Sequence, residues 1–255
     1  MRRALDIAAP WLLLAILVGL WELACRALQV PSYFLPPPSA IGLAIAQGWP
    51  SLLVSTWNTL KMALLALVVA SVLAQALALA IALSPTAERA VRPLAVFLQV
   101  TPVIAIAPLV VIWAGPDSPD RAIVVLAAIV AFFPIFSGAV TGLKAADPDL
   151  SRLFRLYGAG RLQTLARLRL PSAIPYLLEG HKVAAGLAVI GAVVAEFVAG
   201  SGAAQGLAWR ILEAGNRLQT ARMFAALVVL GLMAALLHVA IDRAEKAALA
   251  WWRGR

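Results

Sequence analysis

The chain has 255 residues, of which 63% are hydrophobic and 13% are charged, and its formal net charge at pH 7 is +9. So much apolar sequence indicates a polytopic membrane protein, because each spanning helix needs about 20 apolar residues. The one cysteine, Cys25, excludes an internal disulfide, and basic residues spread over loops beside apolar segments argue against nucleic-acid binding.

Six apolar windows predict an all-α protein with six transmembrane helices. The windows are residues 10–23, 57–83, 93–113, 122–141, 183–199 and 223–241. The first window follows Arg2 and Arg3, as a secretory signal does, but we expect it to stay uncleaved. Glu22 stands three residues before Cys25, where a lipoprotein-type cleavage site needs an aliphatic residue. We therefore treat residues 1–255 as a single transmembrane domain.

The distribution of Lys and Arg predicts the orientation of these helices. If the N-terminus is cytoplasmic, the inner segments carry 15 of the 21 basic residues and the outer segments carry 5, while Lys61 lies within a span. Cytoplasmic loops of membrane proteins are enriched in Lys and Arg. We therefore expect both termini and the basic loop at residues 144–175 in the cytoplasm, where the positive charge also attracts anionic membrane lipid.

The small residues of the fifth window predict a close-packing face. They recur at steps of three or four, which places them on one side of a helix, and they are Ala184, Ala188, Ala192, Ala195 and Ala199. That side of the helix can approach another backbone closely.

Three residues are candidates for lining a translocation pathway. Pro102 and Pro108 lie in the third window, where each removes a backbone donor and favours a kink. Ordinary helix bending is the alternative for both. Glu196 lies in the fifth window, and because a charge in a membrane is costly, it needs either a structural partner or a place that faces a pore.

The sequence contains no recognisable catalytic or nucleotide-binding motif. His181 and His238 are too far apart to bind zinc as a pair on one helix, and neither a Gly-x-Ser-x-Gly elbow nor a Gly-Lys dipeptide occurs. Without a phosphate-binding loop the chain does not hydrolyse ATP by itself. We therefore expect no enzyme activity and no cofactor or metal bound by this chain.

The basic loop at residues 144–175 predicts a short amphipathic helix. After Pro148, apolar residues follow one another at i, i+3, i+4 and i+7 and form one stripe, which consists of Leu150, Leu153, Phe154 and Tyr157. Asp147 suits the start of this helix and Gly158 its end, where we expect a left-handed backbone conformation. The stripe alone fits a protein-docking helix and an interfacial membrane helix equally well.

A second basic helix is expected in the same loop. It covers residues 161–169 and should end before Pro171, because proline interrupts the backbone hydrogen bonds of a helix. The loop would then hold two short helices, which is more than a simple connection between spans requires.

Motifs along the chain resemble those of a known family. Gly158 is followed after nine residues by Leu168-Arg169-Leu170-Pro171, which is similar to the cytoplasmic EAA signature of binding-protein-dependent ABC importer permeases. Three further segments resemble the nitrate, sulfonate and taurine subgroup, and they are Leu35-Pro36-Pro37-Pro38-Ser39-Ala40, residues 101–109 with Trp113-Ala114-Gly115, and Ala195-Glu196 leading to Gly206-Leu207. The Glu-Ala-Ala triplet of the family would fall at Arg152, Leu153 and Phe154, so its acidic residue is replaced here by a basic one.

The resemblance implies that the loop at residues 144–175 is a coupling element between spans four and five. The residues that it assigns to contact with an ATPase are Leu150, Leu153, Phe154, Tyr157, Gly158, Leu168, Leu170 and Pro171. It further implies a permease of the bacterial inner membrane, in which a second copy completes the pathway. Two separate ATPase subunits would use ATP and Mg, and an extracytoplasmic solute-binding protein would deliver the substrate.

The resemblance leaves the substrate and the second permease subunit open. Nitrate, sulfonates, taurine and similar small organic anions are the usual cargo of the subgroup, and a pyrimidine-type vitamin precursor is the alternative. The pathway would be formed by a homodimer or by a heterodimer. An ion-coupled secondary transporter is a further alternative, which the scarcity of ionisable residues within the spans disfavours.

Overall fold

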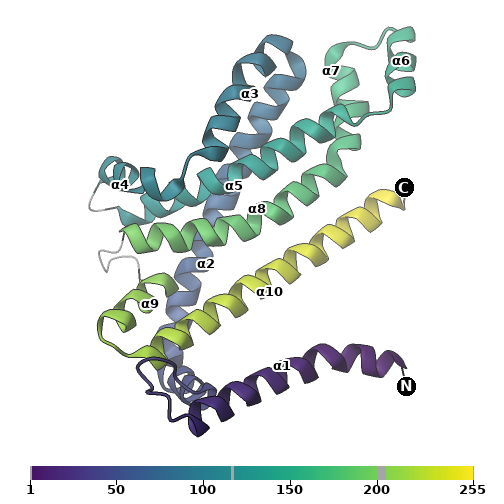
Figure 1. The fold of residues 1–255 in the computed structure, drawn as a ribbon. Helices are drawn as coiled ribbons and strands as arrows, with labels where there is room; N and C mark the ends of the chain where they lie inside the picture. Colours follow the sequence, from purple (N-terminus) through teal and green to yellow (C-terminus); the bar gives the residue numbers. More distant parts are fainter. Residues whose placement is uncertain (1, 116–117, 200–204, 255) are drawn as a thin grey trace. The chain divides into compact units, whose positions relative to one another are not determined.

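The computed structural model describes residues 2–115, 118–199 and 205–254, and every regular element in these ranges is a helix (Figure 1). In chain order they are α1 (Arg2–Ala27), α2 (Pro38–Leu83), α3 (Pro85–Val100), α4 (Val103–Ala114), α5 (Pro119–Lys144), α6 (Pro148–Leu156), α7 (Arg161–Thr164), the π-helical turn η1 (Leu165–Arg169), α8 (Leu170–Ala199), α9 (Leu207–Asn216) and α10 (Thr220–Arg253). The predicted all-α class is thus confirmed.

The chain forms two compact units, which are described separately. The first unit consists of residues 1–57 and 205–231, and the second consists of residues 58–204 and 232–255. Helices α2 and α10 each contribute residues to both units.

Five helices of the described residues are long and apolar enough to cross a membrane. They are Ala9–Ala27, Pro38–Leu83, Pro119–Lys144, Arg161–Ala199 and Thr220–Trp252. The third predicted span, residues 93–113, is not a single helix, because it is divided between α3 and α4. The predicted count of six spanning helices is therefore not confirmed, because the third window is not one continuous helix.

The break lies at Thr101 and Pro102. Both residues are extended, with φ and ψ of −70° and 121° at Thr101 and of −67° and 112° at Pro102. A proline disfavours the helical conformation in the residue before it, so Thr101 ends α3 and Pro102 precedes the first residue of α4. Pro108, by contrast, stays inside α4. The kink expected at Pro102 is a complete interruption of the helix.

A second difference concerns Pro171, where the structure continues the helix that was expected to end. Helices α7, η1 and α8 follow one another without a gap, and α8 contains both Pro171 and Pro175. The Leu170 N–H bonds to the Leu165 carbonyl oxygen, five residues earlier. This wider turn shifts the carbonyls before Pro171 out of α-helical register, which makes room for the proline ring. The fifth spanning helix therefore begins well before residue 183.

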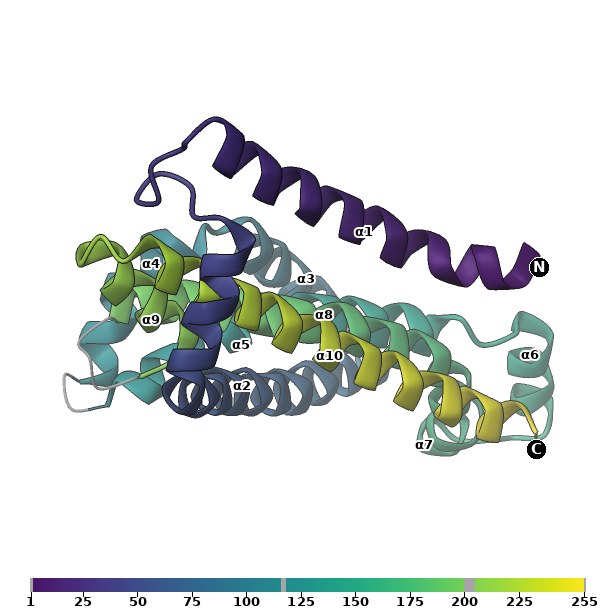
Figure 2. The ribbon, with the colours of Figure 1, turned by 90° about the horizontal axis from the view of Figure 1, so that it is seen from below.

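Helices α5 and α8 form the most tightly packed pair of the second unit, and they run side by side (Figures 1 and 2). A Cβ atom added to Gly180 would lie 2.8 Å from the Pro134 carbonyl oxygen, and one added to Gly191 would lie 2.8 Å from the Cα atom of Ala127. The predicted small-residue face of the fifth window is confirmed as buried, since it comprises Ala184, Ala188, Ala192, Ala195 and Ala199. Small side chains thus let two helix backbones approach closely.

An ion-pair cluster also joins α8 to α10 in the second unit. The Lys182 Nζ atom lies 2.8 Å from an Asp242 carboxylate oxygen and 3.1 Å from one of Glu245. Glu245 is buried, so its charge depends on this cation for compensation.

In the first unit, the end of α1 is attached to the start of α2. The Glu22 carboxylate accepts hydrogen bonds from the Ser39 N–H at 2.9 Å and from the Ser39 hydroxyl at 2.8 Å. The Ser39 N–H belongs to the first turn of α2, whose donors have no partner within the helix. Glu22, which stands at the end of a predicted span, therefore caps a neighbouring helix.

Candidate functional site

The basic loop forms the predicted amphipathic helix, α6, and its sequence sets the start of the helix. The Asp147 carboxylate accepts hydrogen bonds from the N–H groups of Asp149 at 2.7 Å and Leu150 at 3.3 Å. Pro148 occupies the first helical position, where its missing N–H costs nothing. Arg152 pairs with Asp149 at 2.8 Å, so the basic residue expected to replace the acidic residue of the EAA signature has a partner within α6 itself.

The end of α6 is fixed by Gly158. The Gly158 N–H bonds to the Arg155 carbonyl oxygen at 3.0 Å, and the Ala159 N–H bonds to that of Phe154 at 2.9 Å. These two bonds form a Schellman motif, which needs a left-handed residue at the Gly158 position. Gly158 has φ of +69°, which confirms the predicted conformation.

Helix α6 exposes apolar side chains instead of burying them. None of its described residues is buried, and Leu150 and Leu153 are about half exposed. Leu156 and the following Tyr157 are 84% and 83% exposed. We call Leu153, Leu156 and Tyr157 the outer face of α6, since Leu156 and Tyr157 follow Leu153 at i+3 and i+4.

Leu156 was missed by the sequence analysis. The stripe that begins at Leu150 selects Leu153, Phe154 and Tyr157, and Leu156 does not fall on it. In the structure Phe154 is partly buried, so the apolar stripe and the exposed face overlap only in part. The sequence did contain a signal for Leu156. It follows Arg155 and lies four residues after Arg152, so it falls on the basic, solvent-facing side of the helix, where a leucine is exposed.

The second part of the predicted coupling set has a different environment. Leu168 is buried in the second unit, and Leu170 and Pro171 are partly exposed within the continuous helix that leads into α8. These three residues therefore attach the loop to a spanning helix, whereas the residues of the outer face are presented away from it.

The three pathway candidates lie in two different settings. Pro102 and Pro108 are exposed in and beside α4. Glu196 is 2% exposed, and its carboxylate accepts a hydrogen bond of 2.7 Å from the buried Thr59 hydroxyl of α2. The structural partner anticipated for Glu196 is therefore present, within the packed interior of the second unit.

The described residues contain no group of three or more His, Cys, Asp or Glu side chains that could hold a metal ion. What the loop offers is a helix capped at both ends, with an exposed apolar face, joined through α7 and η1 to a long helix. Such an arrangement suits mechanical contact with another protein.

Comparison with known proteins adds a family and several relatives. Residues 68–249 match the model of the binding-protein-dependent transport system inner membrane component family. The chain is 33% identical to the formylaminopyrimidine transport permease protein ThiX of Halalkalibacterium halodurans, over 98% of both chains. It is 30% identical to a probable ABC transporter permease protein of Haemophilus influenzae, over 91% of this chain and 93% of the other. It is also 30% identical to the taurine transport system permease protein TauC of Escherichia coli, over 94% and 88%.

Proposed function

The chain belongs to the family of inner-membrane components of binding-protein-dependent transport systems, and from this premise we propose how it couples ATP hydrolysis to import. It is a multi-pass inner-membrane permease of an ABC transporter and is not itself catalytic. The outer face of α6 docks onto a separate ATPase subunit, which binds ATP and Mg. Movement of that subunit passes through α6 and η1 to α8, and the spanning helices then rotate to give alternating access.

The exposure of Leu156 and Tyr157 is the observation that carries this proposal. Large apolar side chains this exposed, on a helix whose ends are both capped, are costly in water unless they are covered in the assembled protein. An interfacial position in the membrane would cover them too, but membership in a family of ABC transporter permeases implies an ATPase partner. Protein docking is therefore the better account of the outer face.

We propose six membrane crossings, with α3 and α4 together forming the third. At 1.5 Å per residue, the 16 residues of α3 and the 12 of α4 are each too short for a hydrocarbon core of about 30 Å. An interrupted helix is tolerated in a membrane where it lines a cavity or is covered by protein. The interruption at Pro102 therefore supports our proposal that Pro102 and Pro108 lie beside the translocation pathway. Glu196 is the third pathway candidate.

The proposed topology has both termini and the coupling loop at residues 144–175 in the cytoplasm. It rests on the excess of Lys and Arg in the segments assigned to that side. Residues 1–255 then form one transmembrane domain, because α2 and α10 each run without interruption through residues of both compact units.

The proposed assembly contains two copies of this chain, two ATPase subunits and one extracytoplasmic solute-binding protein. Binding-protein dependence is a property of the family, and it implies the last two partners. The second permease subunit is proposed to be another copy of this chain, with a heterodimer as the alternative. Because the chain belongs to a family of ABC transporter permeases, we no longer propose the alternative of an ion-coupled secondary transporter.

The proposed substrate is a small organic anion of the taurine or sulfonate type. Relatives that bear these names include the taurine permease and a putative aliphatic sulfonates transport permease protein of Escherichia coli, each 30% identical to this chain. A pyrimidine-type precursor is the second candidate, because the Halalkalibacterium relative matches over 98% of both chains. Ligand binding by the purified solute-binding protein distinguishes the two.

Replacing Leu153 and Leu156 together with Asp tests the docking face. We expect the variant to insert in the membrane but to lose copurification of the ATPase and substrate-stimulated ATP hydrolysis, because two apolar contacts of about 2 to 5 kcal/mol each are removed. Leu28→Asp is the control, since Leu28 is an exposed loop leucine outside the coupling loop. Wild-type coupling in the double variant contradicts the proposal.

A further inference from the structure

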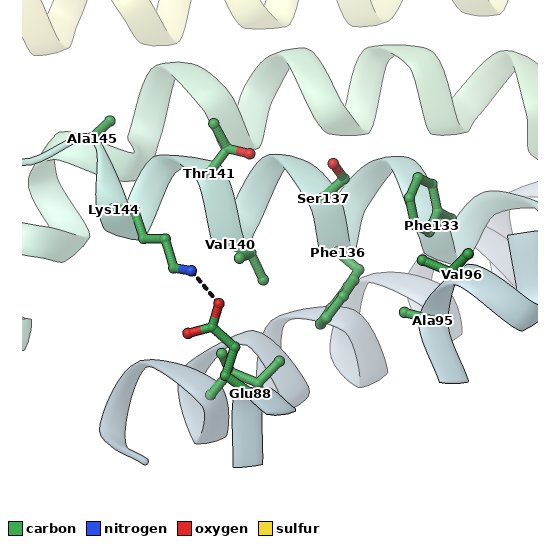
Figure 3. A pocket seen from close by; sticks show the side chains of 11 residues that line it. Glu88, Ala95, Val96, Phe133, Phe136, Ser137, Val140, Thr141, Lys144 and Ala145 are labelled. Atoms are coloured by element: carbon green, nitrogen blue, oxygen red, sulfur yellow. Dashed lines mark hydrogen bonds and ion pairs between the residues drawn. The ribbon is translucent and has the colours of Figure 1, made fainter. Parts of the chain in front are cut away.

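Two adjoining cavities lie in the second unit, beside the coupling loop. One has a volume of about 590 Å³ and is mainly apolar, with Val96, Phe133 and Phe136 in its lining (Figure 3). The other has a volume of about 660 Å³ and extends from the ends of α2 and α5 to α6, α7 and η1. We call them the apolar cavity and the basic cavity.

The basic cavity is lined by four cationic side chains. They come from four different elements and are Lys144, Arg155, Arg161 and Arg169. Glu88 is the one carboxylate among the described lining residues, and it forms an ion pair with Lys144. The cavity therefore carries three positive charges in excess, and such a concentration of like charges favours a bound anion.

Polar groups that could orient an anion also line the basic cavity. The hydroxyl-bearing residues Ser151 and Thr164 belong to the lining, and the Arg169 guanidinium is held near α2 by a hydrogen bond of 3.4 Å to the Ala82 carbonyl oxygen. Arginine forks match the geometry of phosphate oxygens well. The lining thus suits a phosphate-type anion.

The two cavities share part of their walls. Both are lined by Ile81, Glu88, Val140 and Lys144. In Figure 3 the Glu88 and Lys144 side chains point toward each other at one end of the apolar cavity, and Phe133 lies further along α5. A ligand that occupies both cavities would therefore have an anionic group next to an apolar part.

We propose that the two cavities form one binding site for an anionic phospholipid. Its phosphate occupies the basic cavity among Arg155, Arg161 and Arg169, and the first part of an acyl chain occupies the apolar cavity. Basic pockets between membrane helices bind anionic lipid headgroups, and the adjoining apolar cavity favours a lipid over a free phosphate ion. The lipid site does not include the outer face of α6, but residues of α6 line it. A bound lipid therefore stabilises the position of α6 in which the outer face contacts the ATPase.

Native mass spectrometry of the full-length protein, released from phosphatidylcholine nanodiscs that contain phosphatidylglycerol, tests the site. In the variant Arg155→Gln with Arg161→Gln, we expect the affinity for phosphatidylglycerol to fall about 30-fold, since two cations near the phosphate are lost. Arg152→Gln with Arg167→Gln is the matched control. It removes the same charge from exposed positions of α6 and η1 that do not line the cavity, and it should keep wild-type affinity.

A third variant keeps the proposal testable if the glutamine substitutions disturb the loop. Arg155→Lys with Arg161→Lys retains the charge and should retain most of the affinity for phosphatidylglycerol. Equal losses in the cavity variant and in the matched control would overturn the proposal. So would displacement of phosphatidylglycerol by millimolar inorganic phosphate, because this would assign the basic cavity to a free anion. The measurement of lipid affinity needs no ATPase. Its result is therefore independent of whether the outer face of α6 docks onto an ATPase.

Discussion

The α5–α8 pair and helix α6 use apolar residues in opposite ways. Between α5 and α8, glycine and alanine bring the backbones together, and little apolar surface remains exposed along this seam. In α6, no described residue is buried, and leucine and tyrosine side chains project outward. Both regions belong to the second unit, and α6 follows α5 along the chain and leads through α7 and η1 into α8.

This difference indicates a division of labour. A closely packed helix pair resists deformation, because interiors at this packing density have little free volume to absorb a shift. A short helix with capped ends and an uncovered apolar face gains further stability when a partner covers that face. We interpret the α5–α8 pair as the rigid part that moves as a body, and α6 as the part that receives the motion.

Among three substitutions with matched controls, we expect the largest effect at Gly180. A Cβ atom there meets a backbone oxygen of Pro134, which cannot rotate away, so α5 and α8 must separate. Gly180→Val should lower the free energy of unfolding by about 3 kcal/mol, as overpacked cores do. Thermal unfolding in detergent measures this loss.

Gly186→Val is the control for Gly180→Val. Gly186 lies in the same helix, but a Cβ atom added there meets nothing within 4 Å. Its unfolding temperature should stay close to that of the wild type. Equal destabilisation by the two substitutions would show that the loss does not come from the contact with Pro134, and the close-packing account of the pair would be lost.

The next effect in size concerns Glu196, an acidic residue that belongs to the packed region. Glu196→Leu removes the acceptor of the Thr59 hydroxyl and should cost about 1 to 3 kcal/mol, whereas Glu196→Gln keeps an acceptor and should cost less. Detergent stability and transport are measured for both. If both variants match the wild type in stability and transport, the residue is incidental. Loss of transport in a stable Glu196→Gln protein supports a pathway role.

The smallest effect is expected at the end of α6. Gly158→Val forces a β-branched residue into a left-handed conformation at a cost of about 1 to 2 kcal/mol, so amide hydrogens of α6 should exchange about 5- to 30-fold faster. Gly160→Val is the control, because Gly160 has φ of −67° and open space around its Cα atom. Equal exchange rates in the two variants would remove the special role of Gly158.

The local features of α6 could be predicted from sequence because they depend on neighbouring residues. The Asp147 cap, the left-handed Gly158 and the helix between them follow from hydrogen bonds within a few residues. The small-residue face of α8 could be predicted for a similar reason, since helical periodicity alone places those alanines on one side.

The effects of proline could not be predicted in the same way. Pro102 and Pro171 place the same constraint on the residue before them, yet the helix breaks at the first and continues through the second. Leu170, which precedes Pro171, stays helical with φ of −63° and ψ of −47° because the π-turn before it accommodates the ring. Whether a chain adopts that turn depends on what packs around it, and Leu165 and Leu168 of η1 are both buried. The exposure of Leu156 likewise depends on where the whole loop lies.

Photocrosslinking from single positions tests the central claim, that the outer face of α6 contacts the ATPase, most directly. A photoreactive residue at position 156 should crosslink to the copurified ATPase, whereas one at position 151, which lines the basic cavity, or at the exposed Leu218 should not. Crosslinking of the ATPase from position 151 or 218 with the same yield as from position 156, or none from position 156 in an assembled complex, would contradict the account.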